Sequence, residues 1–102
     1  MRVRFQHLRM LVEDEIRRLV VNDELVKASL LLLDLAEVFE KSRVTEAILI
    51  ARGASQLYRE LNSDVLDYES ARQEGNKLTV RIIRLLDAIS ADAEHTKDVA
   101  KP

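Results

Sequence analysis

Residues 24–40 have the sequence ELVKASLLLLDLAEVFE, in which apolar residues recur at the spacing of an α-helix. Leu30 falls almost opposite the core-facing stripe of this helix, because each residue turns a helix by about 100°. Val26 and Leu33 flank Leu30, one turn away in each direction. A helix with two apolar stripes has two partners, so this segment predicts a helical bundle and a second contact. The expected core-facing stripe consists of Leu25, Ala28, Leu32, Leu35 and Phe39.

The same spacing continues on both sides of this segment and predicts three further helices. Asn22 and Asp23 are expected to close the first helix and to cap the second, and Asp67 is expected to cap the fourth. The first helix is expected from about residue 4 to 21, the third up to about residue 62, and the fourth from about residue 67 to 90.

These helices predict an all-α fold, a compact antiparallel bundle of four helices of the death-fold or up-down type. The chain of 102 residues has room for one domain, which is assigned to residues 1–91. Residues 92–102 alternate between small and charged residues and are expected to form a flexible tail or linker. The remaining residues expected in the core are Phe5, Leu8, Val12, Ile16 and Leu19 in the first helix, Val44, Ala47, Ala51, Ala54, Tyr58 and Leu61 in the third, and Tyr68, Ala71, Leu78, Ile82, Leu85 and Ile89 in the fourth.

The composition excludes several classes of protein. Two glycines and one proline are too few for the turns of an all-β fold. Without cysteine there is no disulfide framework, Cys-ligated zinc site or thiol nucleophile. The net charge of -2 gives no general attraction to nucleic acid, and charged residues interrupt every apolar run before the roughly 20 residues that span a bilayer. We therefore expect a soluble cytoplasmic protein that binds neither nucleic acid nor a membrane.

No catalytic, metal or cofactor site is predicted. His7 and His95 lie far apart in the sequence and are expected to be solvated surface residues. The consecutive acids at residues 13–15 point in three directions around a helix, so they do not form a metal site. Small helical chorismate mutases bind a dianion with several cationic side chains. The candidates for such a role here are expected to face solvent, and they are Arg17, Arg18, Arg52 and Arg59.

The outer side of the second helix combines aliphatic with acidic residues. Val26, Leu30 and Leu33 form an aliphatic stripe, and Asp34 and Glu37 border it. An apolar centre with a charged rim is typical of protein interfaces. The alternative is that the second helix is central in the bundle and covered on both sides.

The outer side of the fourth helix has the opposite charge. Val80 lies roughly opposite the core-facing residues, with Lys77, Arg81 and Arg84 around it. The alternative here is a solvated basic face without a partner. An acidic face and a basic face on one domain permit head-to-tail association, so we expect a homo-oligomer in which both sets of residues bind a partner.

Several short segments between residues 21 and 89 also match a known pattern in their order and spacing. They are NDELVKA (22–28), LLLLDL (30–35), EAILI (46–50), LYRE (57–60), DYE (67–69), EGNK (74–77) and RLLDAI (84–89). In these segments the chain resembles the eleventh type of bacterial effector-associated domain. The chain differs at residues 51–55, where that family often has a small-small-Arg-aromatic-Asn run, whereas Asn76 matches.

This resemblance implies a small helical adaptor, fused to effectors or signalling domains in bacterial conflict systems such as anti-phage defence. Such adaptors bring proteins together through like-with-like contacts. We therefore expect a non-enzymatic interaction module whose partner is itself or a related adaptor domain on an effector protein. Two alternatives stay open. One is a plain structural homo-oligomer that dimerises through Val26, Leu30 and Leu33, and the other is a mutase-like enzyme.

Overall fold

Over the residues that it describes, the structure, a computed structural model, consists of four α-helices and one short 3₁₀ helix. It describes residues 2–63 and 67–99, with side-chain burial given for residues 7–63 and 67–92. The elements are α1 (Arg2–Val21), α2 (Leu25–Phe39), η1 (Lys41–Arg43), α3 (Val44–Asn62) and α4 (Tyr68–Val99). The expected all-α bundle is confirmed.

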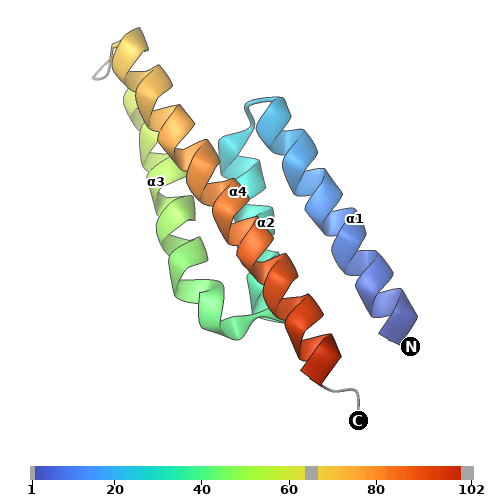
Figure 1. The fold of residues 1–102 in the computed structure, drawn as a ribbon. Coiled ribbons are helices and arrows are strands. Elements are labelled where there is room, and N and C mark those ends of the chain that lie inside the picture. The colour runs from blue at the N-terminus through green and yellow to red at the C-terminus, as the bar shows by residue number, and fades with distance from the viewer. Residues whose placement is uncertain (1, 64–66, 100–102) are drawn as a thin grey trace.

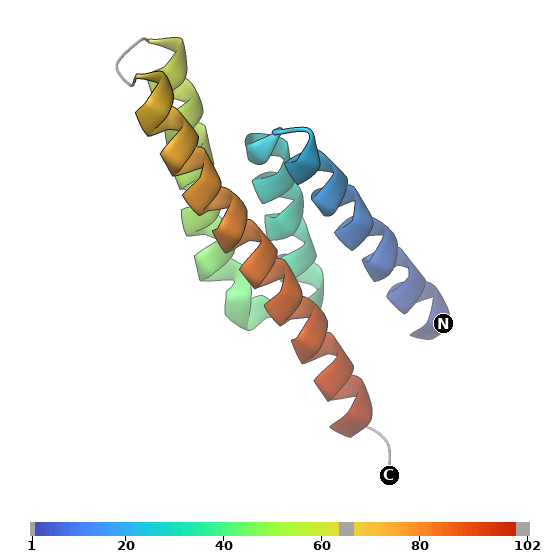
Figure 2. The same cartoon turned by 45° about the horizontal axis from the view of Figure 1, so that its top comes forward.

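Successive helices run in opposite directions, so the chain forms an antiparallel up-down bundle (Figure 1). α2 is the central helix, because it contacts α1, α3 and α4. α4 crosses α2 and packs along α3, whereas α1 packs mainly on α2 (Figure 2). The bundle measures 56 × 22 × 16 Å. The 32 residues of α4 account for most of the long dimension, at a rise of about 1.5 Å per residue.

The core consists of aliphatic side chains from all four helices. The stripe expected on α2 is confirmed, since Leu25, Ala28, Leu32 and Leu35 are buried and Phe39 packs against the buried cluster. Full burial of a leucine or isoleucine side chain stabilises a fold by about 1.5–3 kcal/mol. The other buried apolar residues expected in the core are Ile16, Leu19, Ala47, Ala51, Ala54, Ala71, Leu78, Ile82, Leu85 and Ile89.

At one end of the bundle, three residues expected in the core are exposed instead. Tyr58 is 60% exposed, Leu61 42% and Tyr68 80%. They belong to the last turns of α3 and the first residue of α4. At this end of the bundle both helices continue past the start of α2 (Figure 1). α3 and α4 direct these side chains toward the bundle axis, but α2 does not extend far enough toward this end of the bundle to cover them. The prediction that these three residues are buried is therefore wrong.

A buried ion pair lies within α1, on the side that faces α4. Arg9 is 4% exposed and Glu13 is 5% exposed, and Arg9 Nη1 lies 2.6 Å from Glu13 Oε2. Arg9 Nη1 also donates a hydrogen bond to Ser90 Oγ of α4 at 3.2 Å. With these polar residues turned inward, Leu8 is 53% exposed, so its predicted place in the core is wrong. Phe5, which was also predicted there, lies outside the described side chains.

Asp23 forms the turn between α1 and α2. Its φ angle of 60° places it in the left-handed region. The Glu24 N–H then donates to the Leu19 carbonyl at 2.8 Å, which satisfies one of the free carbonyls at the end of α1. The residue before α2 is Glu24, and its side chain makes no capping hydrogen bond. The prediction that Asn22 and Asp23 cap α2 is therefore wrong.

The two ends of α4 differ in how well they were predicted. Asp67 caps the start as expected, because its Oδ1 accepts a hydrogen bond from the Ser70 backbone N–H at 2.7 Å. This hydrogen bond holds the pKa of Asp67 below its ordinary value of 3.8. The helix continues to Val99, so the predicted end near residue 90 is wrong. Residues 76–101 contain no glycine or proline that would stop a helix.

Replacing Asp67 with alanine should lower the melting temperature at neutral pH, because the Ser70 N–H loses its acceptor. The pKa of Asp67 is lower in the folded chain than in the unfolded one, so its ionised form stabilises the fold, and this contribution is lost as pH falls through the folded pKa. The difference in melting temperature between wild type and Asp67→Ala should therefore shrink in acid. Asp67→Asn, which keeps an oxygen acceptor, serves as the control and should lose less at neutral pH. A difference in melting temperature that is the same at neutral and acidic pH would contradict the role of Asp67 as an ionised cap.

Arg9→Met should lower the free energy of unfolding by about 3 kcal/mol, because Glu13 is left buried without its cationic partner. The double variant Arg9→Met/Glu13→Leu should recover most of that loss, since it removes both charges and keeps the volume. Urea denaturation followed by circular dichroism measures both effects. A double variant no more stable than Arg9→Met would show that the unpaired carboxylate is not the cause.

Candidate protein interaction surfaces

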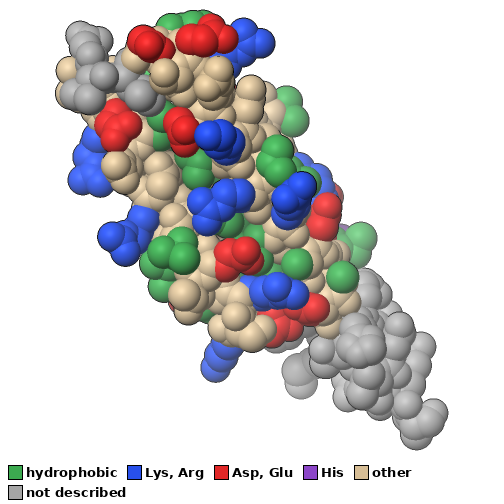
Figure 3. Space-filling model, turned by 60° about the vertical axis from the view of Figure 1, so that its left-hand side comes forward, with side chains coloured by type: hydrophobic (Ala, Val, Ile, Leu, Met, Phe, Trp, Pro, Cys, Tyr) green, Lys and Arg blue, Asp and Glu red, His purple; other side chains and the backbone are tan. Residues whose placement is uncertain are grey.

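The outer side of α4 carries the expected basic face, defined as Lys77, Val80, Arg81 and Arg84. Val80 is 47% exposed, and the three cations around it are exposed. Together with Asn76 they line a shallow hollow of about 480 Å³. Figure 3 shows Lys and Arg side chains interspersed with hydrophobic ones on the side of the molecule that it brings forward.

The cations of the basic face differ in how they are paired. Lys77 Nζ lies 3.3 Å from Glu74 Oε1 in the preceding turn of α4. Arg81 and Arg84 have no ion-pair partner among the residues that the structure describes. Their guanidinium groups are therefore free to pair with carboxylates of another molecule.

The outer side of α2 carries the acidic face, defined as Leu30, Asp34 and Glu37. Leu30 is 49% exposed, and both carboxylates are exposed. Val26 and Leu33, which were expected to widen this stripe, are half-buried and pack against the core. α2 is thus central in the bundle, and it still exposes Leu30 on its outer side.

The acidic and basic faces point away from each other. The core-facing residues of α2 and α4 belong to one buried cluster that lies between the two helices. Leu30 and Val80 lie roughly opposite the core-facing stripes of their own helices. The two faces of one chain therefore cannot meet, and a contact between them requires two copies.

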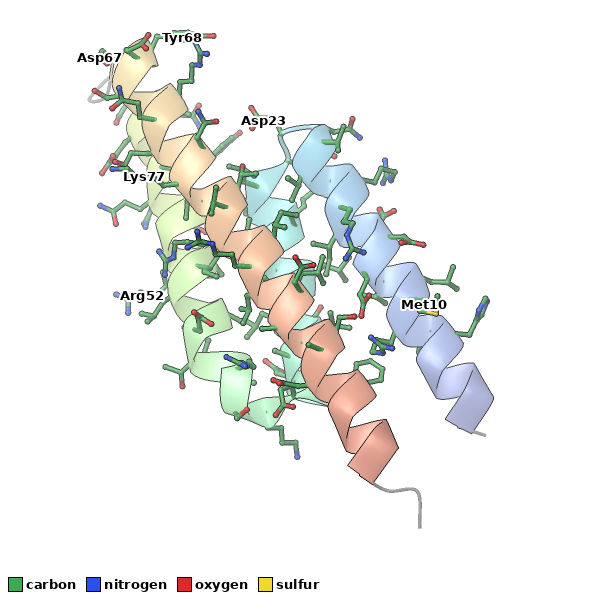
Figure 4. The ribbon with its side chains drawn as sticks, in the orientation of Figure 1. Met10, Asp23, Arg52, Asp67, Tyr68 and Lys77 are labelled. Carbon is green, nitrogen blue, oxygen red and sulfur yellow. The ribbon has the colours of Figure 1, made fainter. Side chains whose placement is uncertain are left out.

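A third surface is a groove at the end of the bundle where α3 and α4 project past α2. We call it the end groove. It has a volume of about 680 Å³. Figure 4 shows Tyr68 at this end of α4 and Asp23 at the nearby turn between α1 and α2. Its walls come from three elements, and its lining includes Leu25 and Val26 of α2, Ala54, Leu57, Tyr58 and Leu61 of α3, and Tyr68, Ala71 and Gly75 of α4.

The end groove is not among the features predicted from the sequence, because Tyr58, Leu61 and Tyr68 were expected in the core. A signal for it was present in the sequence. The segment predicted for the second helix is shorter than the one predicted for the fourth, so part of the fourth helix had to extend beyond its neighbour. Leu49, an exposed residue of α3, lies outside this groove at 50% exposure.

The residues considered for chemistry lie mainly on the surface. His7 is exposed, and His95 lies outside the described side chains. No group of three His, Asp or Glu side chains able to hold a metal ion occurs among the described residues. The arginines considered for a mutase-like site do not surround a cavity in the described part of the chain, and all are exposed: Arg17, Arg18, Arg52 and Arg59.

Two further results bear on the class of protein. Among the described residues, none of the helices combines the length and the apolar character that crossing a membrane requires. Comparison with known proteins found no matching family model, no matching curated protein and no matching solved structure.

Proposed function

We propose that this chain is a protein–protein interaction module that joins copies of itself, or a related domain on an effector protein, through the acidic face of one copy and the basic face of the next. The observation that carries the proposal is the half-exposure of Leu30 and Val80 at the centres of two faces of opposite charge. The resemblance to the eleventh type of bacterial effector-associated domain supports an adaptor role in a bacterial defence system.

The two faces supply different parts of a contact. Leu30 and Val80 give apolar area to bury, and the charges around them orient the partners and select among them. Asp34 and Glu37, like Arg81 and Arg84, make no ion pair among the described residues, so pairing between copies breaks no contact within a copy.

The geometry of the faces favours head-to-tail assembly. Because they point in opposite directions, each copy that uses its acidic face leaves its basic face open, which produces rings or filaments. Assembly of this kind raises the local concentration of fused effectors. The alternative, a closed dimer through Val26, Leu30 and Leu33, has less surface to use, because two of these three residues already pack against the core.

Arg81→Glu should weaken self-association by about tenfold, because it places a carboxylate opposite Asp34 and Glu37 of the next copy. Adding Asp34→Lys should restore part of the affinity by reversing the pair. Sedimentation over a dilution series at low and high salt measures both, and the wild-type contact should weaken as salt rises. Arg52→Glu makes the same charge change on α3, outside the basic face, and should have little effect.

Two outcomes would contradict the proposal. One is a wild-type chain whose mass does not change with concentration and that binds no related domain. The other is an equal loss of association in Arg81→Glu and Arg52→Glu, which would assign the effect to net charge rather than to the basic face.

A further inference from the structure

The end groove is an uncovered continuation of the core. Tyr58 and Leu61 continue the inward stripe of α3, one and two turns beyond the buried Ala54, yet they are 60% and 42% exposed. Tyr68, the first residue of α4, is 80% exposed at the same end. An apolar stripe that faces inward but is left uncovered by the described residues indicates a partner outside the chain.

The groove has the size and lining of a binding site. Its volume of about 680 Å³ lies within the range of about 300–1,000 Å³ that is usual for ligand pockets. Small residues, Ala54, Ala71 and Gly75, leave room for side chains that enter from outside. Tyrosine is enriched at protein interfaces because it combines a large apolar ring with a polar tip.

Two unpaired charges of opposite sign line the groove. Arg72 comes from α4, and Asp23 comes from the turn between α1 and α2. Both side chains are exposed, and neither has an ion-pair partner among the described residues. A partner with charge of a single sign would satisfy only one of them. A second copy of the same surface satisfies both, because a two-fold axis brings residue i of each copy to residue j of the other.

We propose that a second copy of this chain docks on the end groove through a two-fold contact. The projecting ends of α3 and α4 of each copy cover the groove of the other, and Arg72 of each copy pairs with Asp23 of the other. This contact is separate from the head-to-tail contact, because none of the residues that define the acidic and basic faces lines the end groove. The two surfaces adjoin at Asn76, which lines both the groove and the hollow of the basic face.

The two tyrosines supply much of the surface for such a contact. At 60% and 80% exposure, Tyr58 and Tyr68 present about 300 Å² of aromatic surface on each copy. Leu61 and the rim of the groove add to this surface, and a specific interface buries at least about 1,000 Å² in total from both partners.

The first test fills the groove. A Cβ added at Gly75 would lie 3.9 Å from Leu25 Cδ1 and 4.0 Å from Leu57 Cδ2, which are ordinary contacts. Gly75→Ala is therefore the matched control and should keep the dimer. Gly75→Phe places a ring in the groove and should raise the dimer dissociation constant by at least about tenfold.

Both variants are made in the full chain that also carries Arg81→Glu, so that the head-to-tail contact is weakened in every sample. Sedimentation equilibrium measures the dissociation constant, and circular dichroism confirms that each variant is helical. A dimer that persists with Gly75→Ala and is lost with Gly75→Phe supports the proposal. A concentration-independent monomer in both Gly75 variants, or equal dimerisation of both, overturns the proposal. This conclusion does not depend on the effect of Arg81→Glu alone on the wild-type chain.

The second test determines whether Arg72 of one copy lies near Asp23 of the other. Because the chain contains no cysteine, Arg72→Cys and Asp23→Cys each introduce a single thiol. When the two variants are mixed and treated with a short bis-maleimide, the cross-linked heterodimer should form several-fold more readily than with Arg52→Cys in place of Arg72→Cys. Equal yields would overturn the pairing of Arg72 with Asp23.

Discussion

Burial of α2 against three other helices is the constraint on which the rest of the structure depends. Leu32 and Ala28 are fully buried at its centre, and removing either side chain would open a gap between α2 and its neighbours. The same central position leaves only a narrow strip of α2 in contact with solvent. Leu30 lies on that strip beside Asp34 and Glu37, and the strip also exposes Lys27 and Val38.

The length of α2 also determines where the bundle is incomplete. α2 has 15 residues, whereas α3 has 19 and α4 has 32. The longer helices continue their apolar stripes past the start of α2, and at that end no other part of the described chain covers Tyr58 and Tyr68. The end groove is therefore a consequence of unequal helix lengths, and no unusual residue is needed to explain it.

The two proposed contacts belong to different symmetry classes. A contact between the acidic and basic faces is heterologous and continues from copy to copy, whereas a contact between end grooves is isologous and closes on itself. Used together, they would join head-to-tail chains in pairs. Such an assembly presents many copies of a fused domain in a small volume, which is the physical basis for clustering effectors.

Helical periodicity was sufficient to predict the helices, their antiparallel order and most of the core. A helix forms through local hydrogen bonds, and the spacing of its apolar residues indicates which side is buried. The outward positions of Leu30 and Val80 followed from the same spacing. Periodicity failed where exposure depends on a neighbouring helix. The spacing of apolar residues around Tyr68 does not indicate that α2 stops short of this end of the bundle and leaves Tyr68 uncovered.

Local sequence by itself therefore determined which residues form helices and which side of each helix is apolar. Only the tertiary structure decided which apolar stripes are covered, that α1 turns the Arg9–Glu13 pair inward in place of Leu8, and that α4 continues past Ser90. The physical reason is that burial is a property of pairs of helices, since it depends on their relative length and rotation, and neither quantity is contained in the periodicity of a single helix.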